Sequence, residues 1–286
     1  MALHLSLAER LRLWLLEDAP FRDEAAALLG LSRVGGVLEA VAKTPGVAAC
    51  TEELAAALRL LGFEAEAVVA GGSPVEPGDV LLAIRGRGDV LSALERTVLD
   101  VLAYASGIAT ATRMLVEEAR RVNPRVRVAA TRKTVPGFRL CAKAAFEQGG
   151  GDPYRWSLSD AIIVKDTHVE LLGSFDEALG RLRGRSPYRV VVVEARTPQE
   201  ALLAARAGAD AVLLDNMEPR EVEETLRLLE EEGLRGHVTV EASGGIGPGN
   251  IAAYAATGVD VVSTSYPFRH PAPVDISARA RRLNLA

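Results

Sequence analysis

Short apolar runs return at regular intervals through the second half of the chain, and a polar residue follows nearly every one. Runs that are apolar throughout indicate strands buried on both faces, as in a parallel sheet covered by helices. Helical stretches that begin with proline lie between the later runs, and proline favours the first turn of a helix. Six strand runs are clear, at Val126–Ala130, Ala161–Val164, Val190–Val193, Ala211–Leu214, Val238–Val240 and Val259–Val262, and the helical stretches are Pro198–Ala207, Pro219–Glu232 and Pro248–Ala256.

This alternation, with polar residues at the carboxyl ends of the strands, is typical of an α/β barrel. A seventh strand could lie within Leu140–Trp156. No eighth run is visible, so an open doubly wound sheet remains an alternative.

The first hundred residues have a different texture. Helical patterns at Ser6–Glu17 and Glu52–Leu61 alternate with turn-rich extended pieces, which indicates an α+β arrangement. A long helical stretch then runs from about Leu91 to Val122, with a break expected near Ser106-Gly107.

Composition excludes several classes of protein. A net charge of −5 argues against a general nucleic-acid surface, which would normally be basic. Two cysteines, Cys50 and Cys141, form neither a disulfide framework nor a zinc-binding spacing, so we expect a cytoplasmic protein. The leucines of Leu11–Leu16 are interrupted by charge, and no apolar run reaches the length of a membrane span.

Lysine is scarce, and three of the four lysines fall in one stretch rich in glycine and arginine. Lys133, with Arg132, and Lys165 follow predicted strands directly, at the end of a barrel where active sites lie. Arg155 lies on the segment between these strands, as do Arg139 and Lys143, which we consider equally compatible with a solvated surface. The cluster predicts a site for a small molecule with several negative charges.

Two acids and a glycine loop end the later strands. Glu194 and Asp215 close successive strands, where carboxylates could hold Mg²⁺, bind sugar hydroxyls, or pair with the cations opposite. Ser243–Asn250 contains four glycines and opens a helix, a place where backbone N–H groups can hold a phosphate. His168 is equally compatible with a role in acid–base chemistry or substrate contact and with a structural role.

Several segments stand in a fixed order along the chain: Glu95-Arg96-Thr97, Ser106–Thr112, Thr131–Gly137 with Arg139, Gly149–Gly151 with Arg155, Val164–His168, Leu214-Asp215-Asn216 and Ser243-Gly244-Gly245. In order and spacing they resemble quinolinate phosphoribosyltransferase, the carboxylating nicotinate-nucleotide pyrophosphorylase, from about Ala42 to Ser277.

The resemblance implies a seven-stranded, incomplete α/β barrel with a smaller α+β N-terminal domain. The N-terminal domain would be residues 1–107, joined by the C-terminal segment 270–286, and the barrel would be residues 108–269. It also implies a homodimer, or a higher homo-oligomer, in which the partner's N-terminal region closes each barrel mouth and Arg96 serves the neighbour's site.

The resemblance further implies transfer of phosphoribosyl from phosphoribosyl pyrophosphate to quinolinate, with loss of CO₂, to give nicotinate mononucleotide in NAD biosynthesis. Glu194 and Asp215 would face Mg²⁺ and the ribose, and with Lys133 and Lys165 they would be the catalytic residues. The groups that face the quinolinate carboxylates and the phosphates would be Arg132, Lys133, Arg155, Lys165 and His168, with Ser243, Gly244 and Gly245 at the 5-phosphate.

The chain departs from the family pattern at Pro153-Tyr154-Arg155, where Asn-His-Arg is usual, at Thr167, where asparagine is usual, and at Ser265, which replaces a glycine. Tyr154 favours a rival function, a phosphoribosyltransferase for another heteroaromatic acid. A Schiff-base lyase using Lys165 is a more distant rival. A non-catalytic phosphosugar-binding protein is disfavoured, because Glu194 and Asp215 would weaken anion binding.

Overall fold

The computed structural model describes residues 2–283, and these residues divide into two compact units. The first unit comprises the chain up to Arg113, residues Thr134–Gly150 and the chain from Pro267 onward. The second comprises Met114–Lys133 and Gly151–Tyr266. Among the described residues, no helix is both long and apolar enough to span a membrane.

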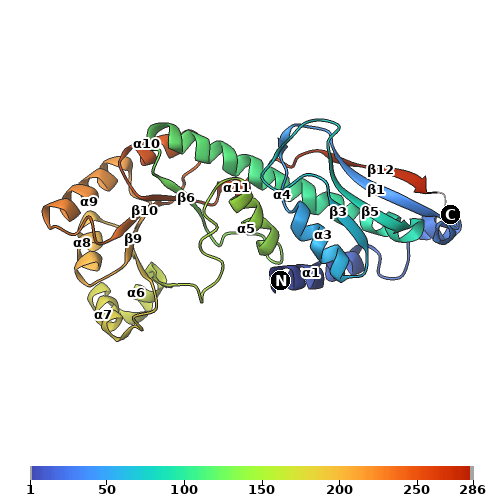
Figure 1. Ribbon diagram of the computed structural model, residues 1–286. Coiled ribbons are helices and arrows are strands. Elements are labelled where there is room, and N and C mark those ends of the chain that lie inside the picture. Colours follow the sequence, from blue (N-terminus) through green and yellow to red (C-terminus); the bar gives the residue numbers. More distant parts are fainter. Residues whose placement is uncertain (1, 284–286) are drawn as a thin grey trace. The chain divides into compact units, whose positions relative to one another are not determined.

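The first unit is built on an antiparallel sheet in the order β12-β1-β5-β3 (Figure 1). Strand β1 pairs along its whole length with β12, so the end of the chain returns to a strand near its beginning. The strands are β1 (Gly35–Ala42), β3 (Glu64–Ala67), β5 (Val80–Arg87) and β12 (Ile276–Leu283), with the small pair β2 (Gly46–Val47) and β4 (Pro74–Val75) beside them.

Helices of the first unit confirm the predicted α+β pattern. The two predicted early helices are present as α1 and α3. The helical elements are α1 (Ala2–Asp18), α2 (Glu24–Leu28), η1 (Leu31–Arg33), α3 (Thr51–Leu60) and α5 (Arg139–Gln148), with the first part of α4 (Gly88–Val122) and all of α11 (Tyr266–Arg269) except Tyr266.

Helix α4 is continuous over 35 residues, so the break predicted near Ser106-Gly107 is wrong. Gly107 lies inside the helix, at a point where close packing leaves no room for a side chain. A Cβ atom there would lie 2.5 Å from the Ala272 carbonyl oxygen and 3.0 Å from Pro273 Cα. The missing side chain therefore lets the returning C-terminal segment pass against the helix.

The second unit contains a parallel sheet of six strands in the order β6-β11-β10-β9-β8-β7, which confirms the predicted α/β class. Helices α8, α9 and α10 lie along one side of these strands (Figure 1). The strands are β6 (Arg127–Ala130), β7 (Ile162–Val164), β8 (Val191–Ala195), β9 (Ala211–Asp215), β10 (Thr239–Ser243) and β11 (Val261–Thr264); the helices are α6 (Asp166–Leu172), α7 (Phe175–Arg181), η2 (Leu182–Gly184), α8 (Pro198–Arg206), α9 (Pro219–Glu231) and α10 (Ile251–Ala256).

The seventh strand expected within Leu140–Trp156 is reduced to a single bridge. Asp152 pairs in parallel with Ala129 of β6, through the bonds Ala130 N–Asp152 O at 2.9 Å and Asp152 N–Val128 O at 2.8 Å. Most of the remaining segment forms helix α5, so only one residue extends the sheet beyond β6.

The register of the strands sets which side chains share a face. Val192, Ala211 and Leu213 form one apolar cluster against which Ile163 packs, and we call this side of the sheet the inner face. Because side chains alternate along a strand, residues two positions further on also point to the inner face. The inner-face residues at the carboxyl ends of the six strands form what we call the mouth of the second unit.

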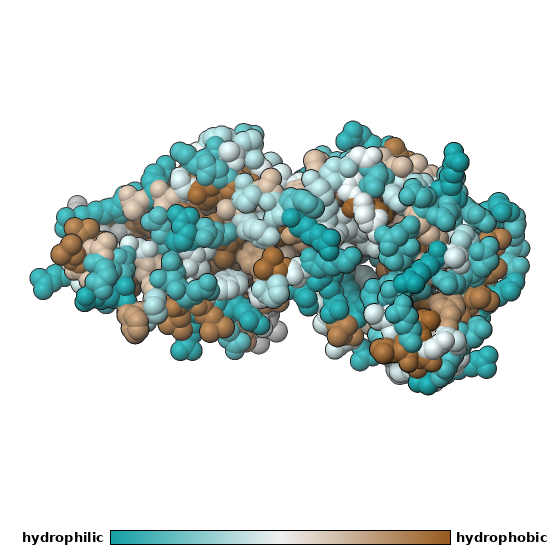
Figure 2. Space-filling view, turned by 180° about the vertical axis from the view of Figure 1, so that it is seen from behind, coloured by the Kyte–Doolittle hydropathy of each residue, from teal (hydrophilic) through white to brown (hydrophobic). Residues whose placement is uncertain are grey.

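The surface is mostly hydrophilic, with apolar patches between charged side chains (Figure 2). Several large apolar side chains of the first unit are widely exposed, among them Phe21, which is 97% exposed, and Leu28, which is 88% exposed.

We predict that Gly107→Ala lowers the melting temperature, because the added methyl group meets backbone atoms that cannot move aside cheaply. Overpacking of this kind costs about 1–3 kcal/mol, and each kcal/mol corresponds to about 2–4 °C in a domain of this size. Gly180→Ala is the matched control, since Gly180 lies in helix α7 with nothing within 4 Å of an added Cβ. Thermal unfolding of both variants decides the matter, and equal stability would refute the packing role.

Candidate active site

An ion pair joins two of the predicted site residues in the mouth. Lys165 directly follows β7, whose last residue Val164 pairs with Val193, so Lys165 stands level with Glu194 on β8. The Lys165 Nζ and Glu194 Oε2 atoms lie 2.6 Å apart. Lys165 is 45% exposed and the Glu194 side chain only 6%, so the lysine presents its charge to solvent while the acid lies beneath. The salt bridge that we considered for the acids is thus present in the protein without substrate.

Arg155 is the most informative cation, because it is buried and makes no ion pair with a carboxylate among residues 2–283. Arg155 is only 7% exposed. Its Nε donates to the Ser157 carbonyl at 2.7 Å, and within residues 2–283 no carboxylate lies within ion-pair distance of it. Burial, and then the nearby charge of Arg132, lower the pKa of its guanidinium. A buried cation without a counter-charge is costly, so this position is suited to binding an anion.

Arg132 and Lys133 lie just beyond the carboxyl end of β6, after Thr131. Lys133 is exposed, and its backbone N–H donates to Thr131 Oγ1 at 3.1 Å, which shapes the turn after the strand. The charge of Arg132 acts on Arg155, whose guanidinium pKa it helps to lower.

Asp215 ends β9, and its neighbour Asn216 has a positive φ of 56°. The Asn216 side-chain amide donates to Asp215 Oδ2 at 2.9 Å, and the Asn216 backbone N–H donates to the Ser243 carbonyl at 2.8 Å. These bonds hold Asp215 beside the first residue of the glycine loop.

The glycine loop requires glycine where it passes Asn216. Gly244 has a φ of 110°, and a Cβ there would collide with the Asn216 side chain. The predicted loop, Ser243–Asn250, ends where helix α10 begins at Ile251, whereas the helix was predicted to begin at Pro248. Asn250 closes the intervening turn: its Oδ1 accepts from Gly247 N at 2.8 Å, and its Nδ2 donates to the Gly245 carbonyl at 3.2 Å.

His168 lies on helix α6, with its side chain exposed. Its Nδ1 accepts a hydrogen bond from the Lys165 backbone N–H at 3.0 Å, which caps the start of this helix. The His168 ring therefore has a structural role beside Lys165.

One inner-face residue, Glu241, was not among the predicted site residues. Glu241 pairs in register with Leu213, as Glu194 does, so the two acids lie at one level on either side of that leucine. Glu241 is buried, and burial raises the pKa of its carboxyl group. The hydroxyl of Tyr154 is also buried and has no hydrogen-bond partner among residues 2–283. Burial, and then the charge of Glu241, raise the pKa of this tyrosine. The period of two from Ser243 back to Glu241 is a sequence signal that could have identified this acid.

The remaining predicted cations lie in the first unit. Arg139 Nε donates to Thr134 Oγ1 at 3.2 Å, and Lys143 is fully buried with its Nζ 5.8 Å from the centre of the Phe268 ring. Lys143 is thus a core residue, not a solvated one.

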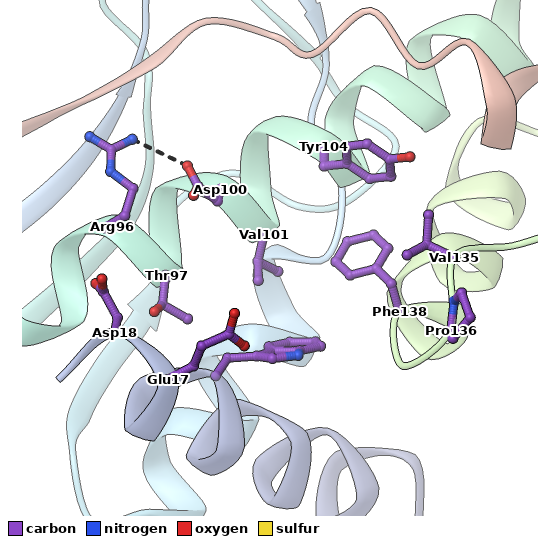
Figure 3. Close-up of a pocket in the computed structure, with 11 residues that line it drawn as sticks. Glu17, Asp18, Arg96, Thr97, Asp100, Val101, Tyr104, Val135, Pro136 and Phe138 are labelled. Atoms are coloured by element: carbon purple, nitrogen blue, oxygen red, sulfur yellow. Dashed lines mark hydrogen bonds and ion pairs between the residues drawn. The ribbon is translucent and has the colours of Figure 1, made fainter. Parts of the chain in front are cut away.

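Arg96 lies on helix α4 and pairs with Asp100 at 3.2 Å (Figure 3). Both residues line a pocket of 610 Å³ within the first unit. Its apolar side includes Tyr104 and Phe138, whose rings meet edge to face at 5.2 Å.

Metal-binding capacity is limited to pairs of acids. Among residues 2–283, no three histidine, cysteine or acidic side chains gather closely enough to hold a metal ion by themselves. A metal bound through Glu194 and Asp215 would therefore need further oxygen ligands from a substrate, which is the usual habit of Mg²⁺.

Comparison with known proteins covers almost the entire chain. The family model for the quinolinate phosphoribosyl transferase N-terminal domain matches residues 23–106, and the model for the C-terminal domain of the same family matches residues 108–279.

Individual relatives agree with the family models. A probable nicotinate-nucleotide pyrophosphorylase (carboxylating) of Archaeoglobus fulgidus is 47% identical over 209 residues, which cover 73% of this chain and 80% of that protein. The nicotinate-nucleotide pyrophosphorylase (carboxylating) of Rattus norvegicus is 37% identical over 259 residues, covering 90% of this chain and 85% of its own. The crystal structure of NadC from Streptococcus pyogenes superimposes with a TM-score of 0.85 at 30% identity, covering 96% of each chain.

Proposed function

Because the chain belongs to the quinolinate phosphoribosyl transferase family, we propose that the mouth of the second unit is where it performs that family's reaction. The enzyme is a carboxylating phosphoribosyltransferase of NAD biosynthesis. It joins quinolinate to the ribosyl group of phosphoribosyl pyrophosphate and forms nicotinate mononucleotide, pyrophosphate and CO₂.

The buried, unpaired charge of Arg155 is the observation that carries the assignment of the mouth. Together with Arg132 and Lys165 it provides cations for the two carboxylates of quinolinate. An arginine whose Nε is already occupied still offers its terminal NH₂ groups, which suit a carboxylate. Lys133 and His168 complete the set of groups that we assign to substrate anions.

Phosphoribosyl pyrophosphate would lie against the later strands. We assign Ser243, Gly244 and Gly245 to its 5-phosphate, because glycines let a phosphate approach backbone N–H groups closely and Gly245 is exposed. Glu194 and Asp215 would hydrogen-bond the ribose hydroxyls and hold Mg²⁺ together with phosphate oxygens. When bound, Mg²⁺ supplies positive charge that stabilises pyrophosphate as it leaves.

The chain's own residues position the substrates and neutralise their charges. The bond from ribose C1 to pyrophosphate breaks, the pyridine nitrogen forms the new bond to C1, and the carboxylates of Glu194 and Asp215 favour the cationic character of the sugar in between. The bond from C2 to its carboxylate then breaks and CO₂ departs. The electron pair of that bond stays at C2, where the adjacent positively charged nitrogen stabilises it, and a proton then bonds to C2. Orientation and charge suffice for these steps, so no protein nucleophile is required.

Tyr154 stands where the family usually has a histidine, so the hydrogen bond that it can offer is neutral. Neutral bonds are roughly half as strong as charge-assisted ones. Quinolinate would therefore depend more on Arg132, Arg155 and Lys165 in this chain.

A homodimer or higher homo-oligomer with shared sites is also part of the proposal, with Arg96 serving the neighbouring mouth. The apolar side chains of Phe21 and Leu28, exposed in the first unit, support a surface that a second copy would cover. We also propose that the enzyme works in the cytoplasm, consistent with two cysteines that are free in the structure.

Product analysis tests the proposed function. With quinolinate, phosphoribosyl pyrophosphate and Mg²⁺ we expect equal amounts of CO₂ and nicotinate mononucleotide. Nicotinate should not react, because cations placed for a second carboxylate are left unpaired when it is absent. Turnover of nicotinate as well as quinolinate, or no turnover of quinolinate, would favour the alternative function, a phosphoribosyltransferase for another heteroaromatic acid.

We predict that Lys133→Ala lowers turnover by at least ~10²-fold, the scale of loss when one preorganised charge-stabilising donor is removed. Lys133→Arg should restore only part of it, since a planar fork does not replace a point charge. Arg125→Ala is the control, because Arg125 is an exposed cation just before β6, at the opposite end of that strand. Near-native turnover of Lys133→Ala would remove Lys133 from the site.

Sharing of sites between subunits predicts complementation. Arg96→Ala and Lys133→Ala proteins should each be inactive, whereas a mixture allowed to exchange subunits should regain part of the activity, because some mixed dimers hold one intact site. Exchange is checked with differently tagged copies. No recovery despite proven exchange would exclude the shared site.

A further inference from the structure

Arg155 lies on a segment, residues 152–160, in which the structure has neither helix nor strand beyond the single bridge at Asp152. A loop of this kind does not hold a side chain in one place by itself, because its backbone lacks the regular hydrogen bonds of an element. Two aspartates supply the missing bonds, one at each end of the segment.

Asp152 fixes the beginning of the segment. Its backbone forms the bridge to β6, and its carboxylate binds in two directions. Oδ2 accepts from Arg127 Nε at 3.1 Å, and Oδ1 accepts from the Tyr154 backbone N–H at 3.0 Å. The residue just before Arg155 is thereby tied to the edge of the sheet.

Asp160 fixes the end of the segment. Its Oδ2 accepts from the backbone N–H groups of Trp156 at 2.7 Å and Ser157 at 2.9 Å, and its Oδ1 accepts from Ser157 Oγ at 2.8 Å. The bonds from Ser157 lower the pKa of this carboxyl group, so it is ionised at neutral pH. The turn that results presents the Ser157 carbonyl, which accepts from Arg155 Nε at 2.7 Å.

We propose that Asp152 and Asp160 are positioning residues that act together as a clamp on Arg155 and aim its terminal NH₂ groups at a substrate carboxylate. The inference rests on the proposed role of Arg155 in binding quinolinate. Neither aspartate needs to touch the substrate. They act through the backbone on either side of the arginine, and Asp160 acts also through the carbonyl that its turn presents.

The clamp predicts a selective defect. Asp160→Ala should raise the KM for quinolinate ~10- to 100-fold, since a small misplacement of a binding group can cost up to about 10²-fold. The KM for phosphoribosyl pyrophosphate should change by less than about 2-fold, because that substrate is assigned to other strands. Asp152→Ala should show the same selectivity from the other end. Asp176→Ala, an exposed acid in the first turn of α7, is the matched control and should leave both values unchanged.

A double-mutant cycle separates positioning from general damage. In the Arg155→Ala background, adding Asp160→Ala should cause no further loss of quinolinate binding, because the group that it positions is already gone. Binding is measured by calorimetry, so variants too slow for kinetics can still be compared. Hydrogen exchange at Trp156 and Ser157 should quicken in Asp160→Ala, with the melting temperature close to native.

Several results would overturn the clamp: a native quinolinate KM in Asp160→Ala despite faster exchange at Trp156 and Ser157, an equal loss for both substrates, or a fully additive loss in the Arg155→Ala background. If Asp160→Ala does not fold, Asp160→Asn, which keeps the size of the side chain and loses its charge, is put through the same measurements. Failure of the proposed function is recognised separately, because the native enzyme itself would then not turn over quinolinate.

Discussion

The common register of six parallel strands is the constraint on which the site depends. Because paired residues stand at one level and side chains alternate, the polar residues two positions beyond Ile163, Val192 and Leu213 reach the mouth. Lys165 and Glu194 stand at one level in this way, and Asp215 and Ser243 stand at the next. A shift of one residue in any strand would turn its polar side chain toward the covering helices. The same packing that buries the apolar cluster therefore also places the charges.

Charge balance in the mouth is uneven, and the imbalance has chemical meaning. Lys165 pairs with Glu194, so the charge of the buried Glu194 carboxylate is compensated. Arg155 makes no ion pair among residues 2–283, and the charge of Arg132 adds to the cost of burying it. Under the proposed assignments, a dianionic substrate would neutralise the charges of Arg155 and Arg132, and Glu194 would face ribose or metal while it pairs with Lys165. The ion pair of Lys165 and Glu194 would then join a residue assigned to quinolinate to one assigned to phosphoribosyl pyrophosphate.

The sequence alone predicted the parallel sheet and the residues at the strand ends, because apolar runs and the polar residues after them follow directly from burial. Prediction failed where a contact distant in sequence decides the local structure. Gly107 lies inside a continuous helix, and a segment 165 positions later in the sequence packs against it. The expected seventh strand is only a bridge at Asp152. Glu241 was missed because its position two residues before Ser243 resembles ordinary strand alternation. The hydrogen bonds of Asp160 with Trp156 and Ser157 depend on a loop conformation that no periodicity encodes.

The central claim is that the carboxyl ends of these strands hold quinolinate through cations that the fold leaves unsatisfied. A crystal structure of the enzyme with quinolinate tests it most directly. We expect the pyridine ring in the mouth, with one carboxylate within hydrogen-bond distance of the terminal NH₂ groups of Arg155 and the other bound to Lys165 or Arg132. Quinolinate bound outside the mouth, or in the mouth without contact to Arg155, would contradict the account.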